Sequence, residues 1–282
     1  MTTTANRRPW IVGAAIAIVA IAMIVVVAVW SQSSGGAKVV DVGSTASADR
    51  VDIEATVIRV DAASGELTLR LLVIPRGSLT TEAGLSPGED LEILTSAAVK
   101  TDPFFPAGER IPTVDVAVVL GGTGITAYPF DRHTAPIELT ARYGGRTVDV
   151  HLTLTNRDAL FSASAEAFSE SQTAIVDLEL RRSGSVLTFA IFMIAAMWAL
   201  AIAVATGAWF VVSRRRGLVW PALGWMAATL FAIAGFRNAA PGSPPIGSLI
   251  DYLAFFWAEA VIAVCVFTVV TVGVSVERTR EE

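Results

Sequence analysis

Two histidines are the side chains most readily assigned to metal binding or proton transfer. His133 and His151 are the only histidines in the sequence, and paired imidazoles can ligate a metal or exchange protons near neutral pH. Their expected positions do not converge, because His151 falls opposite Glu138 on the polar side of a predicted hairpin, whereas His133 falls on the other face. We therefore expect no metal, no cofactor and no catalytic residue from this pair.

Other chemical motifs are equally weak. The single cysteine, Cys265, lies in a long apolar segment, which excludes a disulfide framework and a Cys-x-x-Cys site. The glycine-rich run Gly121-Gly122-Thr123-Gly124 has neither the lysine nor the helix pattern of a phosphate-binding loop, so we interpret it as a plain loop. The sequence therefore predicts a protein that is not an enzyme.

Glu259 is the one ionisable residue expected inside an apolar segment. Counted from Tyr252 at 1.5 Å per residue, it lies roughly 10 Å into that segment, where a charge is costly and suggests a function. Arg237 closes the preceding apolar segment and Asp251 ends the intervening loop, so Arg237 is expected to pair with Asp251 or with Glu259. An ion pair that locks two helices is favoured over a transport path, because a transporter commonly has several such residues.

A second cluster of interest is the run Tyr128-Pro129-Phe130-Asp131-Arg132. Proline fixes its own φ and holds the preceding tyrosine extended. The phenylalanine is expected to cover a sheet edge, and the aspartate to accept backbone N–H bonds that close the turn. We interpret the run as a corner that ends the β-domain, with contact to membrane helices or to a partner as the alternative.

Four apolar segments must position these residues. The 282-residue chain is 53% hydrophobic and only 17% charged, which is too apolar for an ordinary soluble protein of this length. Each segment is close to or longer than the ~20 residues that span a hydrocarbon core of about 30 Å. The segments are residues 10–30, 186–212, 218–236 and 253–276.

The arginines suggest an orientation, since short loops rich in Lys and Arg stay cytoplasmic. Arg7 and Arg8 precede the first segment, and Arg214 to Arg216 follow the second. We expect a multi-pass plasma-membrane protein whose first segment is a retained signal anchor, because it exceeds the 7–15 residues of a signal peptide core, with a cleaved signal peptide as the alternative. The cytoplasmic parts are then 1–9, 213–217 and 277–282, and the outer parts are the flexible linker 31–47, the β-domain 48–185 and the loop 237–252.

The β-domain is predicted from alternating apolar and polar residues. The first hairpin runs from Val51 to Pro75, and a two-residue Gly144-Gly145 turn predicts that Tyr143 faces Arg146. Seven or so short strands favour an antiparallel sandwich or a partial barrel. The predicted fold class is a membrane α+β protein with one N-terminal membrane helix, an extracytoplasmic antiparallel β-sandwich-like domain and three C-terminal membrane helices.

Two sequence runs resemble a known family. Y-P-F-D-R-H-T-A-P-I-E-L from Tyr128, together with R-N-A-A-P-G-S-P-P-I-G-S-L-I-D-Y-L-A-F-F-W-A-E from Arg237 to Glu259, is similar to the membrane family called domain of unknown function 4436. The resemblance extends to the layout of an outer domain followed by three membrane helices. It implies no reaction.

A second resemblance concerns the same turn. Y-P-F-D is similar to the F-P-F-D turn that closes the β-sandwich of pentameric ligand-gated ion channels, and Arg181-Arg182 resembles the basic position before their first membrane helix. The chain departs from those channels in its leading anchor and in having only three helices after the domain. This resemblance implies a channel subunit as an alternative.

The net charge of the predicted outer domain limits the classes of partner that it can bind. From Lys38 to Arg182 the chain has 13 basic and 21 acidic residues, a net charge of −8, which disfavours nucleic acid. We expect the bilayer, an envelope protein or lipid, and a second copy of the chain as partners, and an outer domain that binds or scaffolds an envelope component. A channel or transporter subunit is the alternative. The expected working surface is the domain–membrane junction, formed by Tyr128, Pro129, Phe130, Asp131, Arg132, Arg181, Arg182, Arg237, Asp251 and Glu259.

Overall fold

The computed structural model describes residues 40–43, 45–81, 86–95, 102–170 and 172–281, arranged as two compact units. A β-unit ends at Ser183, and a helical unit begins at Gly184. The predicted tail 1–9 and membrane helix 10–30 lie outside the described residues, as do residues 31–39 of the predicted linker.

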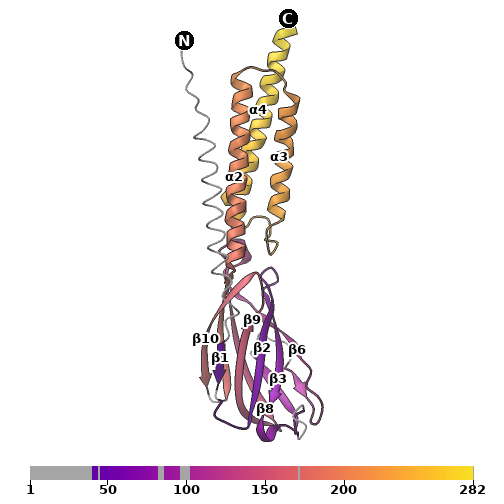
Figure 1. Cartoon of the computed structure of the whole chain (residues 1–282), viewed down its shortest axis with the longest axis vertical. Coiled ribbons are helices and arrows are strands. Elements are labelled where there is room, and N and C mark those ends of the chain that lie inside the picture. The colour runs from indigo at the N-terminus through magenta and orange to yellow at the C-terminus, as the bar shows by residue number, and fades with distance from the viewer. Residues whose placement is uncertain (1–39, 44, 82–85, 96–101, 171, 282) are drawn as a thin grey trace, which may run out of the picture. The chain divides into compact units, whose positions relative to one another are not determined.

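Eleven strands form one continuous sheet in the β-unit (Figure 1). Its main path is β10-β11-β8-β9-β2-β3-β6, with β1 beside β9, and with β4 and β7 beside β8. The strands are β1 (Val40–Gly43), β2 (Arg50–Asp61), β3 (Glu66–Pro75), β4 (Leu91–Thr95), β5 (Phe104–Phe105), β6 (Val114–Val119), β7 (Gly121–Gly122), β8 (Arg132–Tyr143), β9 (Arg146–Asn156), β10 (Phe161–Glu170) and β11 (Thr173–Arg182). Short 3-10 turns η1 (Gly77–Leu79) and η2 (Ile125–Ala127) lie in the connections.

The first predicted hairpin is confirmed as β2 and β3, which pair antiparallel. Every second side chain from Val51 to Val57 is buried, as expected for a strand with one face on the core. A bulge between Val57 and Arg59 then shifts the alternation by one residue, and this places Val60 on the buried face. The three-residue spacing from Val57 to Val60 therefore already indicates the bulge in the sequence.

The Gly144-Gly145 hairpin is confirmed at its turn and wrong beyond it. Tyr143 faces Arg146, and two more pairs follow, but β8 and β9 then separate. Strand β11 pairs with β8 in place of β9, while β9 pairs in parallel with β2. Turn geometry fixes only the first pairs, and competition from strands distant in sequence decides the rest.

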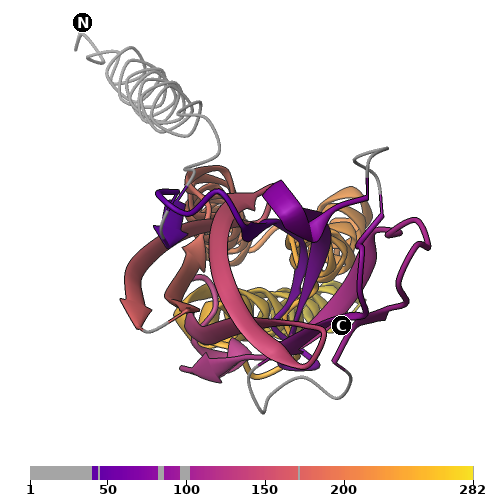
Figure 2. The same cartoon turned by 90° about the horizontal axis from the view of Figure 1, so that it is seen from below.

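The separation of β8 from β9 also corrects the predicted fold class. An antiparallel β-sandwich is wrong, because one mixed sheet bends at this hairpin into a half-barrel that curves around a single core (Figure 2). Both arms of the sheet contribute to that core, and strand β1 lies beside β10 without pairing to it. Fully buried core residues include Ile53, Leu67, Leu69, Leu71, Leu91, Ile93, Leu152, Leu178 and Leu180.

The helical unit contains α2 (Gly184–Ser213), α3 (Trp220–Asn238), the π-helix η3 (Asp251–Phe255) and α4 (Phe256–Glu281). Two helices in the described part of the chain are long and apolar enough to cross a membrane, namely 184–213 and 251–279. Only 28% and 22% of their most apolar windows are buried, so most of their apolar side chains are not covered by the described part of the chain. These two helices support membrane association.

The prediction of three C-terminal membrane helices is therefore wrong, because α3 does not qualify. The apolar segment 218–236 and the helix are offset by two residues, so α3 excludes Leu218 and Val219 and includes Arg237 and Asn238. Pro221 and three interior glycine or threonine positions lower its apolar content further. At 1.5 Å per residue its 19 residues extend about 28 Å, which leaves no excess over a hydrocarbon core.

Candidate functional site

A buried ion pair connects the end of the last strand to the turn before β8. Arg182 is the last residue of β11, and its Nε donates to both carboxylate oxygens of Asp131, at 3.0 Å each. The two side chains are only 2% and 0% exposed. Charges buried this completely require each other, since either one alone would carry the full cost of desolvation.

Three further side chains enclose this pair. Nε2 of His133 lies 3.0 Å from Oδ2 of Asp131. The guanidinium of Arg182 lies 4.2 Å from the ring centre of Phe161 and 5.1 Å from that of Tyr128. Within the described residues Nη2 of Arg182 has no hydrogen-bond acceptor, so the two aromatic faces are what the rest of the cation meets.

These contacts determine the ionisation of Asp131. Burial alone would raise the pKa of this carboxyl group. The hydrogen bond from His133 and the hydrogen bond and charge of Arg182 outweigh it, so the pKa is held below its ordinary value. Asp131 is therefore a stable anion at neutral pH and a poor general acid.

The Tyr128-Pro129-Phe130-Asp131 turn has a different burial from the predicted one. Tyr128 and Pro129 are buried, whereas Phe130 is 53% exposed. The peptide bond between Tyr128 and Pro129 is cis. Asp131 accepts hydrogen bonds from Arg182 and His133 instead of closing the turn through backbone N–H groups, because a buried guanidinium is the stronger partner.

The flanking arginines differ sharply from Arg182. Arg181 is 53% exposed and forms a two-pronged pair with Glu179, with N–O distances of 2.9 and 3.0 Å. Arg132 is exposed, and its backbone exchanges hydrogen bonds with Thr123. The two arginines face each other across β11 and β8 on the outer side of the sheet. Adjacent arginines in the sequence thus have opposite environments.

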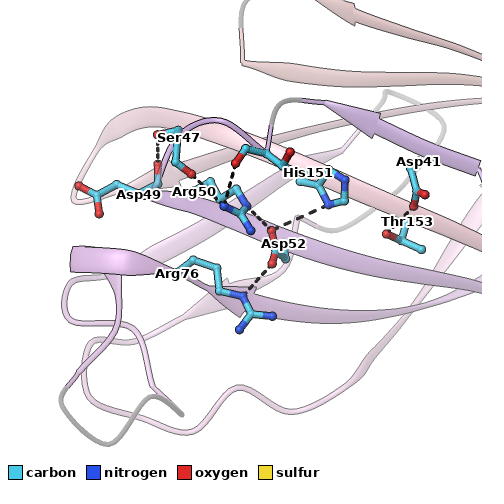
Figure 3. A network of polar contacts seen from close by, with 9 residues as sticks. Asp41, Ser47, Asp49, Arg50, Asp52, Arg76, His151 and Thr153 are labelled. Atoms are coloured by element: carbon cyan, nitrogen blue, oxygen red, sulfur yellow. Dashed lines mark hydrogen bonds and ion pairs between the residues drawn. The ribbon is translucent and has the colours of Figure 1, made fainter.

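His151 belongs to another polar network, on the arm formed by β9, β2 and β3 (Figure 3). Its Nδ1 lies 3.9 Å from Asp52, which also accepts hydrogen bonds of 2.7 Å from Arg50 and from Arg76. Burial acts to raise the pKa of Asp52, but these two hydrogen bonds lower it by more. The predicted pairing of His151 with Glu138 is wrong, because Glu138 faces Ile175 instead.

The structure therefore keeps the two histidines apart, each with its own aspartate. Within the described ranges no group of three or more His, Cys, Asp and Glu side chains is arranged to hold a metal. The sequence also contains one Gly-x-Ser-x-Gly pattern, at residues 84–88. Its Ser86 lies in the connection between η1 and β4, where its carbonyl accepts from Thr81, and not at a strand-to-helix turn.

A second buried ion pair lies in the helical unit. Arg237 near the end of α3 donates to Asp251 through Nε and Nη2, at 2.7 and 2.8 Å. It also donates to the carbonyls of Pro244 and Pro245, while Asp251 accepts from the backbone of Gly247. One arginine thus donates hydrogen bonds both to the first residue of η3 and to the backbone of the proline-rich loop before it.

Asp251, and not Glu259, is therefore the partner of Arg237. Glu259 is half-buried in the first turn of α4, and no described residue gives it a hydrogen bond or an ion pair. The π-helix before it leaves a carbonyl at Leu253 that accepts from the indole of Trp198 in α2, at 3.1 Å. Irregular backbone is tolerated here because side chains satisfy it.

A groove on the outer side of the β-unit was not predicted. It measures about 630 Å³ and is formed by three-residue segments of β8, β10 and β11. Glu166 and Asp177 face each other directly across β10 and β11 in this groove, and neither has an ion pair within the described part of the chain. Opposed like charges on neighbouring strands destabilise a sheet, so this surface is left with uncompensated negative charge.

The ten predicted site residues fall into two groups. Seven of them lie in the β-unit, where Tyr128, Asp131 and Arg182 are in mutual contact. Arg237, Asp251 and Glu259 lie in the helical unit, and only the first two are in contact. That the two groups meet at a single junction stays a prediction.

Comparisons with known proteins match both units. Residues 41–180 match the family model described as Domain of unknown function (DUF4436), and residues 182–276 match a second model, Domain of unknown function (DUF8686). The Tyr128 run lies in the first range and the Arg237–Glu259 run in the second. No curated protein matches the chain.

Replacing Arg182 by methionine should strongly destabilise the β-unit, because Asp131 would stay buried with only His133 beside it. The expected loss of unfolding free energy is about 3–5 kcal/mol. It can be measured by denaturant unfolding of the full-length chain in mild detergent, with hydrogen exchange followed in β8 and β11. The matched control is Arg181→Met, whose exposed ion pair contributes about 1 kcal/mol or less. Equal losses in both variants would contradict the assignment.

The same pair predicts an acid dependence. Because the pKa of Asp131 is lowered by folding, its contribution is complete above the ordinary value of 3.8 and is lost as pH falls through the lower folded value. The difference in unfolding free energy between wild type and Asp131→Asn should be constant from about pH 7 to pH 5 and shrink below about pH 4. Denaturant titrations across this range measure it. A difference that stays constant into strong acid contradicts the prediction.

Proposed function

Because the β-unit of this chain belongs to the family described as domain of unknown function 4436, which has no stated activity, we propose a function from the geometry of the site. The protein is a non-enzymatic membrane scaffold whose β-unit binds a positively charged segment of another envelope component. The groove on β8, β10 and β11 is the observation that carries this proposal.

Three properties of the groove support a cationic partner. In the pairing of β10 with β11, Glu166 lies opposite Asp177, and Ser164 lies opposite Glu179. Among the residues that the structure describes, Glu179 alone of the three carboxylates has a cationic partner, Arg181, so the charges of the other two are open to a ligand. A bound lysine or arginine would relieve the repulsion between Glu166 and Asp177, and binding would be favoured by the net charge of −8 from Lys38 to Arg182.

The proposed location follows from the arginines after α2. Arg214 to Arg216 follow directly on a helix long and apolar enough to cross a membrane. Short basic segments favour the cytoplasmic side, so the β-unit at the other end of α2 would lie outside the plasma membrane. An envelope component is therefore the accessible class of partner.

Neutralising the groove should weaken binding strongly. The full-length chain in mild detergent is titrated with fluorescent oligolysine, and Glu166→Gln with Asp177→Asn is compared with wild type. Loss of the two charges is expected to weaken binding about a hundredfold or more, since each charge-assisted contact contributes about 1.5–3 kcal/mol. The affinity of wild type should fall steeply with salt.

The matched control removes two carboxylates elsewhere on the β-unit, Glu54→Gln on β2 with Asp149→Asn on β9. It changes the net charge by the same amount and should leave binding nearly unchanged. Cross-linking of the wild-type chain in membranes, repeated with both variants, then identifies the native partner. Equal binding by the two double variants would show that net charge, and not the groove, attracts the cation, and would refute this function.

Glu259 favours a channel or transporter subunit as a second candidate. It is a half-buried carboxylate in a helix that qualifies as a membrane span, without an ion pair among the described residues. If it serves a path, cation or proton flux into proteoliposomes should be measurable with wild type, lost with Glu259→Gln and kept with Glu66→Gln on β3. Flux no greater than that of empty liposomes would remove this candidate.

A further inference from the structure

A cavity between two helices of the helical unit has the lining of a phosphate site. It measures about 530 Å³ and lies between the end of α2 and the second half of α4. One part of the lining is polar and cationic, and another is aliphatic. The lining residues are Val212, Ser213, Arg215, Thr271, Val272, Ser275 and Val276.

Arg215 supplies the positive charge of the cavity. Its neighbours Arg214 and Arg216 lie over the ring of Phe210, at 5.4 and 5.1 Å from its centre, and are held there. Arg215 has a positive φ of 46°, which turns the chain after α2 and separates this side chain from the other two. An exposed non-glycine residue in this conformation indicates a local constraint at the end of α2.

A hydroxyl group lies on the opposite wall. Ser275 of α4 is exposed, and within the described ranges its Oγ makes no hydrogen bond. The hydroxyl groups of Ser213 and Thr271 already donate to backbone carbonyls of their own helices. The cavity therefore offers one guanidinium and one available hydroxyl from two different helices, which is a suitable pair for phosphate oxygens.

The surrounding charges leave a positive excess. Glu277 is the nearest carboxylate along α4, and it accepts a hydrogen bond of 3.1 Å from the backbone of Leu218. Arg278 is exposed beside it. The C-terminal end of α2 carries the equivalent of about half a negative charge, which Arg214 to Arg216 exceed.

The length of α2 decides between a lipid and a free phosphate. Thirty residues extend about 45 Å, which exceeds the ~30 Å hydrocarbon core, so the end of the helix reaches the headgroup layer. The aliphatic side chains Val212, Val272 and Val276 line the same cavity and suit the glycerol and upper acyl groups. Basic pockets between membrane helices at this level bind anionic headgroups.

We propose that the phosphate of an anionic phospholipid binds in the cavity between α2 and α4, held by Arg215 and Ser275. The site rests on the membrane location of the proposed function. It is independent of the groove on the β-unit, which lies in the other compact unit.

Native mass spectrometry of the full-length chain in neutral detergent tests the site. Equal amounts of phosphatidylglycerol and phosphatidylcholine are added, and the ratio of the two retained lipids is measured. Wild type should retain phosphatidylglycerol preferentially, and Arg215→Gln should lower the ratio about tenfold, as expected for one charge-assisted hydrogen bond. The control Arg146→Gln removes an exposed arginine from the β8–β9 turn and should leave the ratio unchanged.

A second variant separates loss of charge from loss of folding. Val272→Trp fills the cavity from α4 and keeps every arginine, so it should lower retention as Arg215→Gln does, while Arg215→Lys should keep most of it. Equal ratios for Arg215→Gln and Arg146→Gln overturn the site. So does displacement of the lipid by a large excess of inorganic phosphate, which would show that the site takes free phosphate.

The proposed function can be tested separately in the same experiment. A wild-type chain that retains neither lipid contradicts the membrane location itself. A wild-type chain that retains both lipids equally overturns only the phosphate site.

Discussion

A guanidinium buried at the last residue of β11 requires a counter-charge, and the surroundings of Arg182 are organised by this requirement. Asp131 supplies the charge, His133 shares it, and the rings of Phe161 and Tyr128 cover the rest of the cation. The end of β11, the start of β8 and the start of β10 therefore converge on one ion pair. In the helical unit a buried arginine is likewise paired with an aspartate. The contacts of Arg237 with Asp251 and with two proline carbonyls hold a proline-rich loop and the start of a π-helix. In both units the irregular segment is held by a buried arginine paired with an aspartate.

Local features of the fold could be predicted from the sequence, and non-local ones could not. The alternation in β2 and the glycine pair after Tyr143 act between neighbours in sequence, so they predict the first hairpin and the turn of the second. The replacement of β9 by β11 beside β8 depends on strands that compete across the chain, and no short pattern contains that information. The error in His151 follows directly, because its true neighbour Asp52 lies on a parallel strand. The prediction of a third membrane helix failed for a simpler reason. The helix α3 begins and ends two residues after the apolar segment 218–236.

The candidate sites show the same division. Asp251 was one of two predicted partners of Arg237, because a short loop joins them, and the structure selects it over Glu259. Asp131 and Arg182 were each predicted to matter, but their contact spans 51 positions and needed the structure. The groove had no sequence signal, since Glu166 and Asp177 are ordinary outward-facing residues until β10 and β11 pair. A signal for Arg182 did exist, because strict alternation along β11 places it, and not Arg181, on the buried face.

The parallel pairing of β2 with β9 joins strands that are far apart in the sequence, and this affects how the β-unit folds during synthesis. Ile53 pairs with Leu152, so the second edge of β2 stays open until almost the whole domain has been synthesised. Contacts of such long sequence separation slow folding, since the entropy of closing the loop is lost before the contact forms. During that time the early hairpin exposes an unpaired strand edge, which is prone to association with other chains. We therefore expect the order of synthesis, and not only the final stability, to affect the yield of this domain.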